Sequence, residues 1–262
     1  MQLKDDECFN LIKAIPHRSS NYFETVCCAG VGRDRKWRRQ YPVPFRILGP
    51  GQKFSRWDWL SYKYVDPKND KRFESQKVVS DTLKIGLKVK PPERASFLSP
   101  LVRGSLQEAN DKGESLTLVR PLTLRITHKE KTPKLLISET RKHAAMASQL
   151  SLLENDHEAL PLKPCPYEFK VHWTDQYGTK HTHTSDDWET SAAFFNFRRR
   201  YINEEEAIER LKGKYADYLK RGLVLGFSTH SLRNVTNNTS NQWLLVGMIR
   251  LDEEEQGSLL LN

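Results

Sequence analysis

Alternating apolar and polar positions dominate the first half of the chain and predict short β-strands. The alternation is clearest where Trp57 and Trp59 fall on one face of a strand while Leu60 and Tyr62 fall on the other. Prolines such as Pro121 restrict some of these strands to sheet edges or bulges. The predicted strands cover 23–31, 37–41, 57–64, 78–90 and 115–126. The pattern indicates a small twisted barrel of an OB-like or PUA-like kind.

The second half predicts helices as well as strands, so the fold class is α+β. A basic barrel-like first half is followed by a hairpin, two helices and a second hairpin. The weak pattern near residues 130 and 160 favours a division into 1–130 and 131–262, with one continuous domain as the alternative. The predicted elements are a hairpin at 165–174 and 179–184, helices at 186–201 and 203–221, and strands at 223–227 and 243–251.

Positive charge is concentrated in one window of the sequence. The chain carries 42 Lys and Arg residues against 33 Asp and Glu, which gives a formal net charge of +9. Residues 33–72 hold twelve of the basic residues and four acidic ones, and aromatic residues are interleaved with them. Cations that contact phosphates beside rings that stack on bases are typical of nucleic-acid binding. The chain is therefore expected to bind DNA or RNA through a continuous positive face.

Specific residues in this window are expected to make the contacts. Two other interpretations stay open: the cations could be solvated above a β core, or the aromatic surface could dock the protein as a structural subunit onto a larger complex. The expected phosphate contacts are Arg33, Arg35, Lys36, Arg38, Arg39, Arg46 and Arg56, and the expected stacking rings are Trp37, Tyr41 and Trp57.

Histidines in the second half support an enzymatic hypothesis. His181 and His183 alternate along a predicted strand, so both imidazoles share one face, and Asp187 or Glu189 could complete a metal site. The protein would then be a metal-dependent nuclease or nucleotide-processing enzyme that uses a divalent metal; otherwise no cofactor is expected. The competing interpretation has both imidazoles pointing to solvent while Asp186 caps the next helix.

Two further stretches carry chemically active side chains. Asp70, Glu74 and Lys77 are the residue types of a metal-dependent nuclease, but Glu74 and Lys77 fall on opposite faces of a strand, so ion pairs are the expected outcome. His230 follows an apolar strand in a hydroxyl-rich loop that could bind phosphate or perform acid–base chemistry. The catalytic candidates are His183, Asp187, Glu189 and His230.

Several classes of protein are disfavoured by motifs that the sequence lacks. It contains no glycine-rich nucleotide loop, no zincin motif and no hydrolase serine elbow. The four cysteines show no Cys-x-x-Cys spacing, and no run of about 18 apolar residues occurs. We therefore expect a cytoplasmic protein with reduced thiols, no zinc knuckle and no membrane partner.

Five strings in the sequence resemble an uncharacterised family of bacterial proteins. They are VCCAG at 26–30, RQYPVPFR at 39–46, DWE at 187–189, GFSTHS at 226–231 and QWLLVG at 242–247. The resemblance covers most of the chain and implies a standalone bacterial protein of a mobile-element or defence locus. It brings no assigned activity with it.

Overall fold

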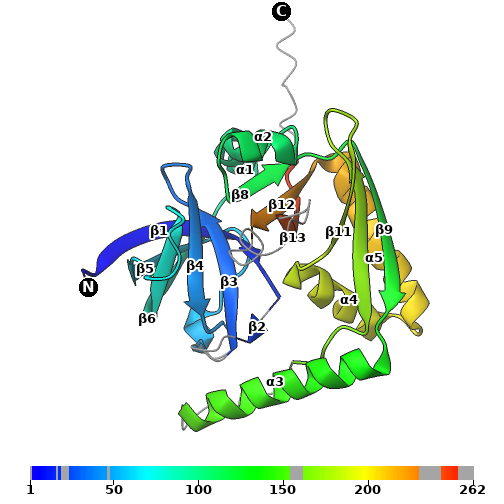
Figure 1. The fold of residues 1–262 in the computed structure, drawn as a ribbon, viewed down its shortest axis with the longest axis horizontal. Helices are drawn as coiled ribbons and strands as arrows, with labels where there is room; N and C mark the ends of the chain where they lie inside the picture. Colours follow the sequence, from blue (N-terminus) through cyan, green and yellow to red (C-terminus); the bar gives the residue numbers. More distant parts are fainter. Residues whose placement is uncertain are drawn as a thin grey trace, which may run out of the picture.

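The first half of the chain forms a closed five-stranded barrel (Figure 1). The computed structural model describes residues 2–15, 17–18, 24–45, 48–153, 162–229 and 243–252. The barrel strands are β1 (Lys4–Lys13), β3 (Glu24–Val31), β4 (Trp37–Val43), β5 (Asp58–Val65) and β6 (Ser75–Lys88), and the short β2 (His17–Arg18) pairs with β3.

Hydrogen bonds run around the circle β1-β5-β6-β4-β3 and return to β1. The β4–β6 pair is parallel and the other pairs are antiparallel. This connectivity is that of a five-stranded Greek-key barrel of the OB kind, which confirms the predicted barrel-like first half. Closure brings β1 and β3 very close, because a Cβ on Gly30 would lie 2.5 Å from the carbonyl oxygen of Phe9.

Helices and two smaller sheets follow the barrel. The four-stranded sheet has the order β13-β12-β8-β7, and the three-stranded sheet has the order β11-β10-β9. The helices are α1 (Pro91–Leu98), α2 (Leu106–Asp111), α3 (Pro133–Leu153), α4 (Trp188–Arg200) and α5 (Glu204–Arg221), with short 3-10 turns at Pro50–Gln52 and Ser99–Leu101. The strands are β7 (Val102–Arg103), β8 (Leu116–Val119), β9 (Thr123–Glu130), β10 (Tyr167–Thr174), β11 (Lys180–Thr184), β12 (Leu223–Thr229) and β13 (Trp243–Arg250).

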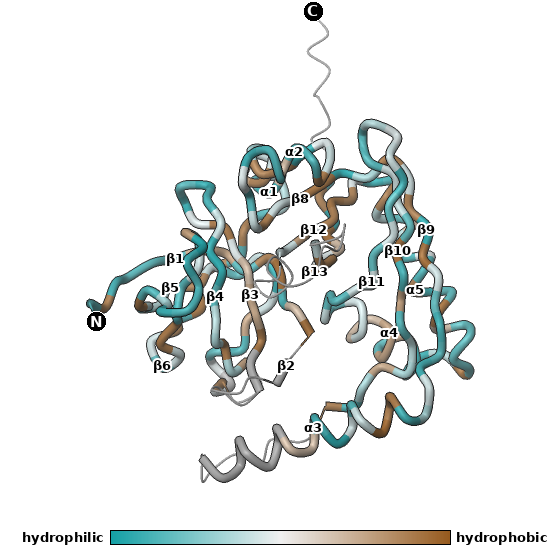
Figure 2. The backbone as a smooth tube through the Cα atoms, viewed as in Figure 1, coloured by the Kyte–Doolittle hydropathy of each residue, from teal (hydrophilic) through white to brown (hydrophobic). Residues whose placement is uncertain are grey.

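The four-stranded sheet is the centre of the molecule and is covered on both faces. One face packs on the outside of the barrel, where Leu118 and Val224 meet Phe9 and Trp37. The other face carries Phe227, which packs in a second cluster with residues of α4, α5 and the three-stranded sheet. Figure 2 shows β12 and β13 in hydrophobic colours between these two parts. β12 therefore shows no alternation of buried and exposed positions, because all seven of its residues are buried.

The predicted strand at 115–126 divides in two. β8 pairs with β12, whereas β9 pairs with β10 in the other sheet, and Pro121 lies between them. Both strands thus hydrogen-bond to strands that follow residue 131. The division into 1–130 and 131–262 stays a prediction. None of the helices in the described ranges is long and apolar enough to cross a membrane.

Candidate nucleic-acid interface

Acidic residues of β1 neutralise part of the basic window. Arg33 pairs with Glu7, and Arg38 pairs with Asp6 at 2.6 Å and with Asp34 at 3.1 Å. Glu7 and Asp6 lie outside the 33–72 window, so a count within the window did not reveal them. Two of the arginines expected to contact phosphate are therefore paired with carboxylates of the barrel itself.

The side chains of Arg39 and Arg56 bond to groups inside the protein rather than extending into solvent. Arg39 is only 7% exposed, forms a 3.1 Å ion pair with Glu74 and donates to Ser228 Oγ at 2.6 Å. Arg56 donates to the carbonyl oxygens of Leu11 and Met248. All three guanidinium nitrogens of Arg39 bond to interior groups, so the prediction that it contacts phosphate is wrong. Arg56 uses Nε and Nη1 in the same way, and its Nη2 is buried 3.8 Å from Asp187, so this guanidinium also faces the interior.

Two of the three predicted stacking rings are core residues. Trp37 and Trp57 are 6% and 7% exposed and pack between the barrel and the four-stranded sheet. A ring packed there has no open face for a base, so the stacking prediction is wrong for both. Tyr41 is half-buried, and Arg35 and Lys36 are exposed in the β3–β4 turn, so these three stay candidates. Arg46 lies outside the described residues.

The usual oligonucleotide face of an OB barrel is closed in this protein. That face belongs to the second and third barrel strands, which here are β3 and β4. Ala29, Val31 and Trp37 on these strands pack against the four-stranded sheet, and Arg39 bonds to Ser115 and Ser228 of the second half. This face of the barrel is therefore not open to an oligonucleotide.

The three-stranded sheet has a polar and cationic outer face. The β9–β10 register places Arg125 opposite His172 and Thr127 opposite Lys170, and the β10–β11 register places Thr174 opposite Lys180. The side chains of this outer face are Thr123, Arg125, Thr127, Lys129, Glu168, Lys170, His172, Thr174, Lys180, Thr182 and Thr184.

Charge on the outer face is strongly unbalanced. Arg125, Lys129, Lys170 and Lys180 are all exposed, and Glu168, 3.8 Å from Lys170, is the one carboxylate on the face. At the centre of the face, His172 forms 2.9 Å hydrogen bonds to the hydroxyl groups of Thr127 and Thr182. Clustered cations on neighbouring strands repel one another, so an anion bound across them would relieve that repulsion.

The inner face of the same hairpin places two histidines against a buried tryptophan. Trp173 stacks on His181 with 4.3 Å between ring centroids, and its indole N–H donates to His183 Nδ1 at 3.1 Å. His181 Nε2 lies 2.9 Å from Oδ2 of Asp175, whose other oxygen accepts from the backbone of Tyr177 and Thr179.

This arrangement fixes both the ring and the carboxylate. A carboxylate can only accept, so His181 Nε2 carries the proton and Nδ1 is the nitrogen left to act as a base. Burial opposes ionisation of Asp175, but the hydrogen bonds from His181, Thr179 and Tyr177 outweigh it and hold the pKa of Asp175 below its ordinary value. The dyad is thus an ionised carboxylate that orients an imidazole.

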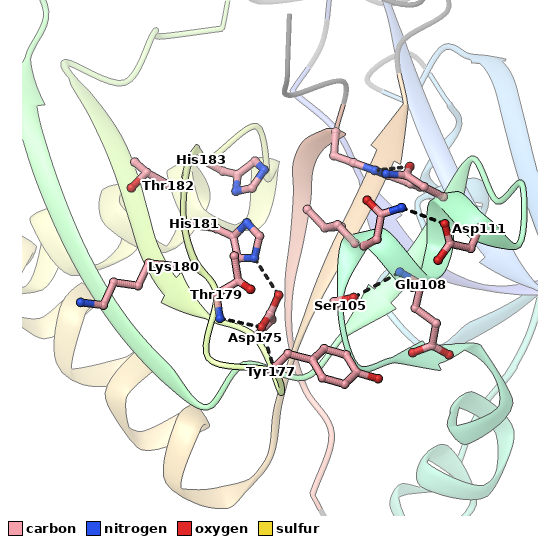
Figure 3. Close-up of a pocket in the computed structure, with 14 residues that line it drawn as sticks. Ser105, Glu108, Asp111, Asp175, Tyr177, Thr179, Lys180, His181, Thr182 and His183 are labelled. Carbon is pink, nitrogen blue, oxygen red and sulfur yellow. Dashed lines mark hydrogen bonds and ion pairs between the residues drawn. The ribbon is translucent and has the colours of Figure 1, made fainter.

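The dyad borders an open cavity of about 750 Å³ between the hairpin, α2 and Trp243 (Figure 3). His181 and His183 point toward the cavity, whereas Lys180 and Thr182 point to the other side of β11. The opposite wall includes Ser105, Glu108 and Asp111. A second cavity of about 350 Å³ lies on the outer face and shares Lys180, His181 and Thr182 with the first. The edge strand β11 therefore joins the cationic face to the dyad.

The predicted metal site does not form from the expected residues. Asp187 is a fully buried residue at the start of α4 and does not lie beside the two imidazoles. Among the residues that the structure describes, no three His, Cys, Asp or Glu side chains gather in a group suited to a metal ion. The competing expectation of solvent-directed imidazoles is also wrong for His183, which is 5% exposed. His230 lies outside the described residues.

The N-cap of helix α4 lies one residue later than predicted. The N-cap is Asp187 rather than Asp186, and its carboxylate accepts from the backbone of Glu189 at 3.1 Å and of Met248 at 3.1 Å. Burial raises the pKa of Asp187 above its ordinary value, although Arg56 opposes the shift. Glu189 pairs with Lys13 of β1 at 3.1 Å. The catalytic candidates Asp187 and Glu189 thus join the barrel to the second half.

The 70–77 stretch forms ion pairs, as expected. Asp70 pairs with Arg72 at 2.5 Å and accepts from Ser75 Oγ at 2.8 Å, while Glu74 pairs with Arg39. The Glu74–Arg39 pair is buried rather than on the surface, which the local pattern could not reveal.

Sequence reasoning missed Asp175 and the outer face of the three-stranded sheet. A signal existed, because Thr, Lys and Arg recur at every second position of 123–129 and 180–184. The pairing of β9 with β10 was needed to place these positions on one face.

Comparison with known proteins is consistent with an uncharacterised family. Residues 5–100 match the model of a domain of unknown function, DUF8758, and residues 102–259 match that of a second domain of unknown function, DUF8757. No curated protein matches the chain. Since the second match covers more than half of the sequence, the chain belongs to the DUF8757 family, with a DUF8758 domain preceding it.

Proposed function

We propose that this protein binds nucleic acid through the outer face of the β9–β10–β11 sheet. The observation that carries the proposal is the set of four exposed cations, Arg125, Lys129, Lys170 and Lys180, beside five threonines and a single carboxylate. Cations attract phosphates, and hydroxyl groups donate hydrogen bonds to phosphate oxygens. The net charge of +9 supports the same conclusion.

The chemistry of the face predicts how the nucleic acid is bound. None of the side chains on the face is a Phe, Tyr or Trp ring that could stack on a base. Contacts are then made to the backbone, which carries no sequence information. Binding should tolerate any sequence and should include both DNA and RNA strands. The exposed Arg35 and Lys36 of the barrel turn are a second place where a long strand could be contacted.

Charge reversal tests the proposal. Arg125→Glu with Lys170→Glu should weaken binding of a fluorescent 20-nucleotide strand at least tenfold in anisotropy titrations at low salt. The matched control reverses two exposed cations of α5, Arg210→Glu with Lys220→Glu, and changes net charge equally. Equal weakening by both pairs would mean that only overall charge matters, and the proposed face would be rejected. Thermal melts of each variant confirm that the fold is retained.

A further inference from the structure

The Asp175–His181 dyad lies where a nucleic-acid strand bound on the cationic face would reach the cavity. Lys180 and Thr182 belong to the outer face, while His181 between them points into the 750 Å³ cavity. Both cavities are lined by these three residues. Because β11 is the edge strand of its sheet, a nucleic-acid strand that crosses it passes from Lys180 on the outer face to His181 on the cavity side.

The surroundings of His181 suit a general base. Its Nε2 is held by Asp175, its ring is held by the stack on Trp173, and its remaining nitrogen can accept a proton. Asp175 is almost fully buried, whereas the His181 side chain retains 21% exposure toward the cavity. A carboxylate behind an imidazole that a substrate can reach is the arrangement by which proteins make an imidazole a proton acceptor.

The opposite wall fits a nucleoside rather than another phosphate. Glu108 and Asp111 carry negative charge, so this wall would repel phosphate and can accept hydrogen bonds from a base. A volume of about 750 Å³ is in the range of cavities that hold small ligands.

We propose that His181, oriented by Asp175, is the general base of a metal-independent RNA cleavage at this cavity. The inference rests on the proposed nucleic-acid binding and names RNA as its substrate. His181 Nδ1 takes the proton of a ribose 2′-hydroxyl, and the 2′-oxygen attacks the adjacent phosphorus. The O2′–P bond forms while the P–O5′ bond breaks, and the leaving 5′-oxygen takes a proton from water. The products are a 2′,3′-cyclic phosphate and a 5′-hydroxyl, and the imidazolium returns its proton to water.

The test uses the full chain with three labelled strands of one sequence in EDTA: all RNA, all DNA, and DNA with a single ribonucleotide. We expect all three to bind, the RNA to be cut to cyclic-phosphate ends, and the mixed strand to be cut only at its ribonucleotide. Binding without cleavage of either ribonucleotide-containing strand would overturn this inference and leave the proposed function standing. No binding of any strand would remove both.

Two variants identify the residues. His181→Gln should slow cleavage at least 100-fold, as expected for loss of a general base. Asp175→Asn, which removes a positioning charge, should slow it about tenfold and move the acidic limb of the pH–rate profile to lower pH, because the imidazolium loses its counter-charge. His128→Gln, at the far end of β9, is the matched control and should cleave at the wild-type rate. Full cleavage by His181→Gln would overturn the inference.

Discussion

The guanidinium of Arg39 and the carboxylate of Glu74 form a 3.1 Å ion pair in which the two side chains are 8% and 2% exposed. The same guanidinium donates to Ser115 and Ser228, so one arginine of β4 links the barrel to the four-stranded sheet. This pair turns an expected surface cation into an interior contact between the two parts of the protein.

Removing one partner of this ion pair should strongly lower the free energy of unfolding, whereas replacing both partners with apolar residues should not. Arg39→Met leaves the Glu74 carboxylate buried without its partner and should lower the free energy of unfolding by about 3–5 kcal/mol in urea titrations. Arg39→Met with Glu74→Met removes both charges and should recover most of that loss. The exposed pair of Lys212 and Glu209 on α5 is the control, since its removal should cost below about 1 kcal/mol. A double variant as unstable as Arg39→Met would contradict this account.

Asp187 should be a stability residue rather than a catalytic one. Asp187→Ala removes the helix cap and leaves the backbone N–H of Met248 without its acceptor, so unfolding free energy should fall by about 2–4 kcal/mol. Asp187→Asn keeps one acceptor oxygen and should cost about half as much. Urea denaturation followed by circular dichroism measures both. A loss below about 0.5 kcal/mol for Asp187→Ala would show that the cap and the Met248 contact contribute little.

Acid should weaken the contacts that Asp70, in the loop before β6, makes with Arg72 and Ser75. Burial opposes ionisation of Asp70, but the hydrogen bonds from Arg72 and Ser75 outweigh it and lower the pKa of Asp70 to about 2. The unfolded value is near 3.9, so this group adds stability that is fully present above about pH 4 and is lost as pH falls toward 2.

The matching variant is Asp70→Asn. It should be about 1–2 kcal/mol less stable than wild type at pH 7, and the difference should become small at pH 2 and disappear below it. Chemical denaturation at a series of pH values measures it. A difference that stays constant from pH 7 to pH 2 would mean that the ionised carboxylate is not the stabilising form.

The buried barrel thiols of Cys8 and Cys28 should be inert in the native protein. Burial raises the pKa of Cys8 to about 12 and also raises that of Cys28, although hydrogen bonds to Cys8 partly offset the shift. The reactive thiolate is therefore scarce at pH 8. Alkylation by iodoacetamide, followed residue by residue with mass spectrometry, should occur at these two sites only as fast as the protein unfolds. Rapid labelling in native buffer would contradict the buried positions.

Much of the fold could be predicted from local pattern, and the exceptions have physical causes. The hairpin of β10 and β11, the helices α4 and α5, and the apolar β12 lie close to their predicted ranges, because each is amphipathic or bounded by clear turn residues. β1 was missed because its last six residues are all buried, between the barrel interior and the four-stranded sheet, so no alternation is visible. The long α3 was missed as well.

The site could be predicted only in part. The sequence shows which residues are charged, but it does not show which distant residues the fold brings against them. Arg38 looks like a surface cation until β1 brings Asp6 against it, and Trp37 looks like a stacking ring until the four-stranded sheet covers it. His181 was identified as a chemically active residue, but its partner Asp175 lies between the two predicted strands of the hairpin and was not singled out.

The salt dependence of binding tests the central claim most directly. A single strand that loses one counterion per protein cation gives a slope of about −0.7 per contact in a plot of log K against log salt concentration. With the four outer-face cations in contact, the wild-type slope should be about −3. The variant with Arg125, Lys129, Lys170 and Lys180 all changed to Gln should have a slope close to zero. A flat wild-type response, or a variant slope equal to that of the wild type, would contradict nucleic-acid binding through this face.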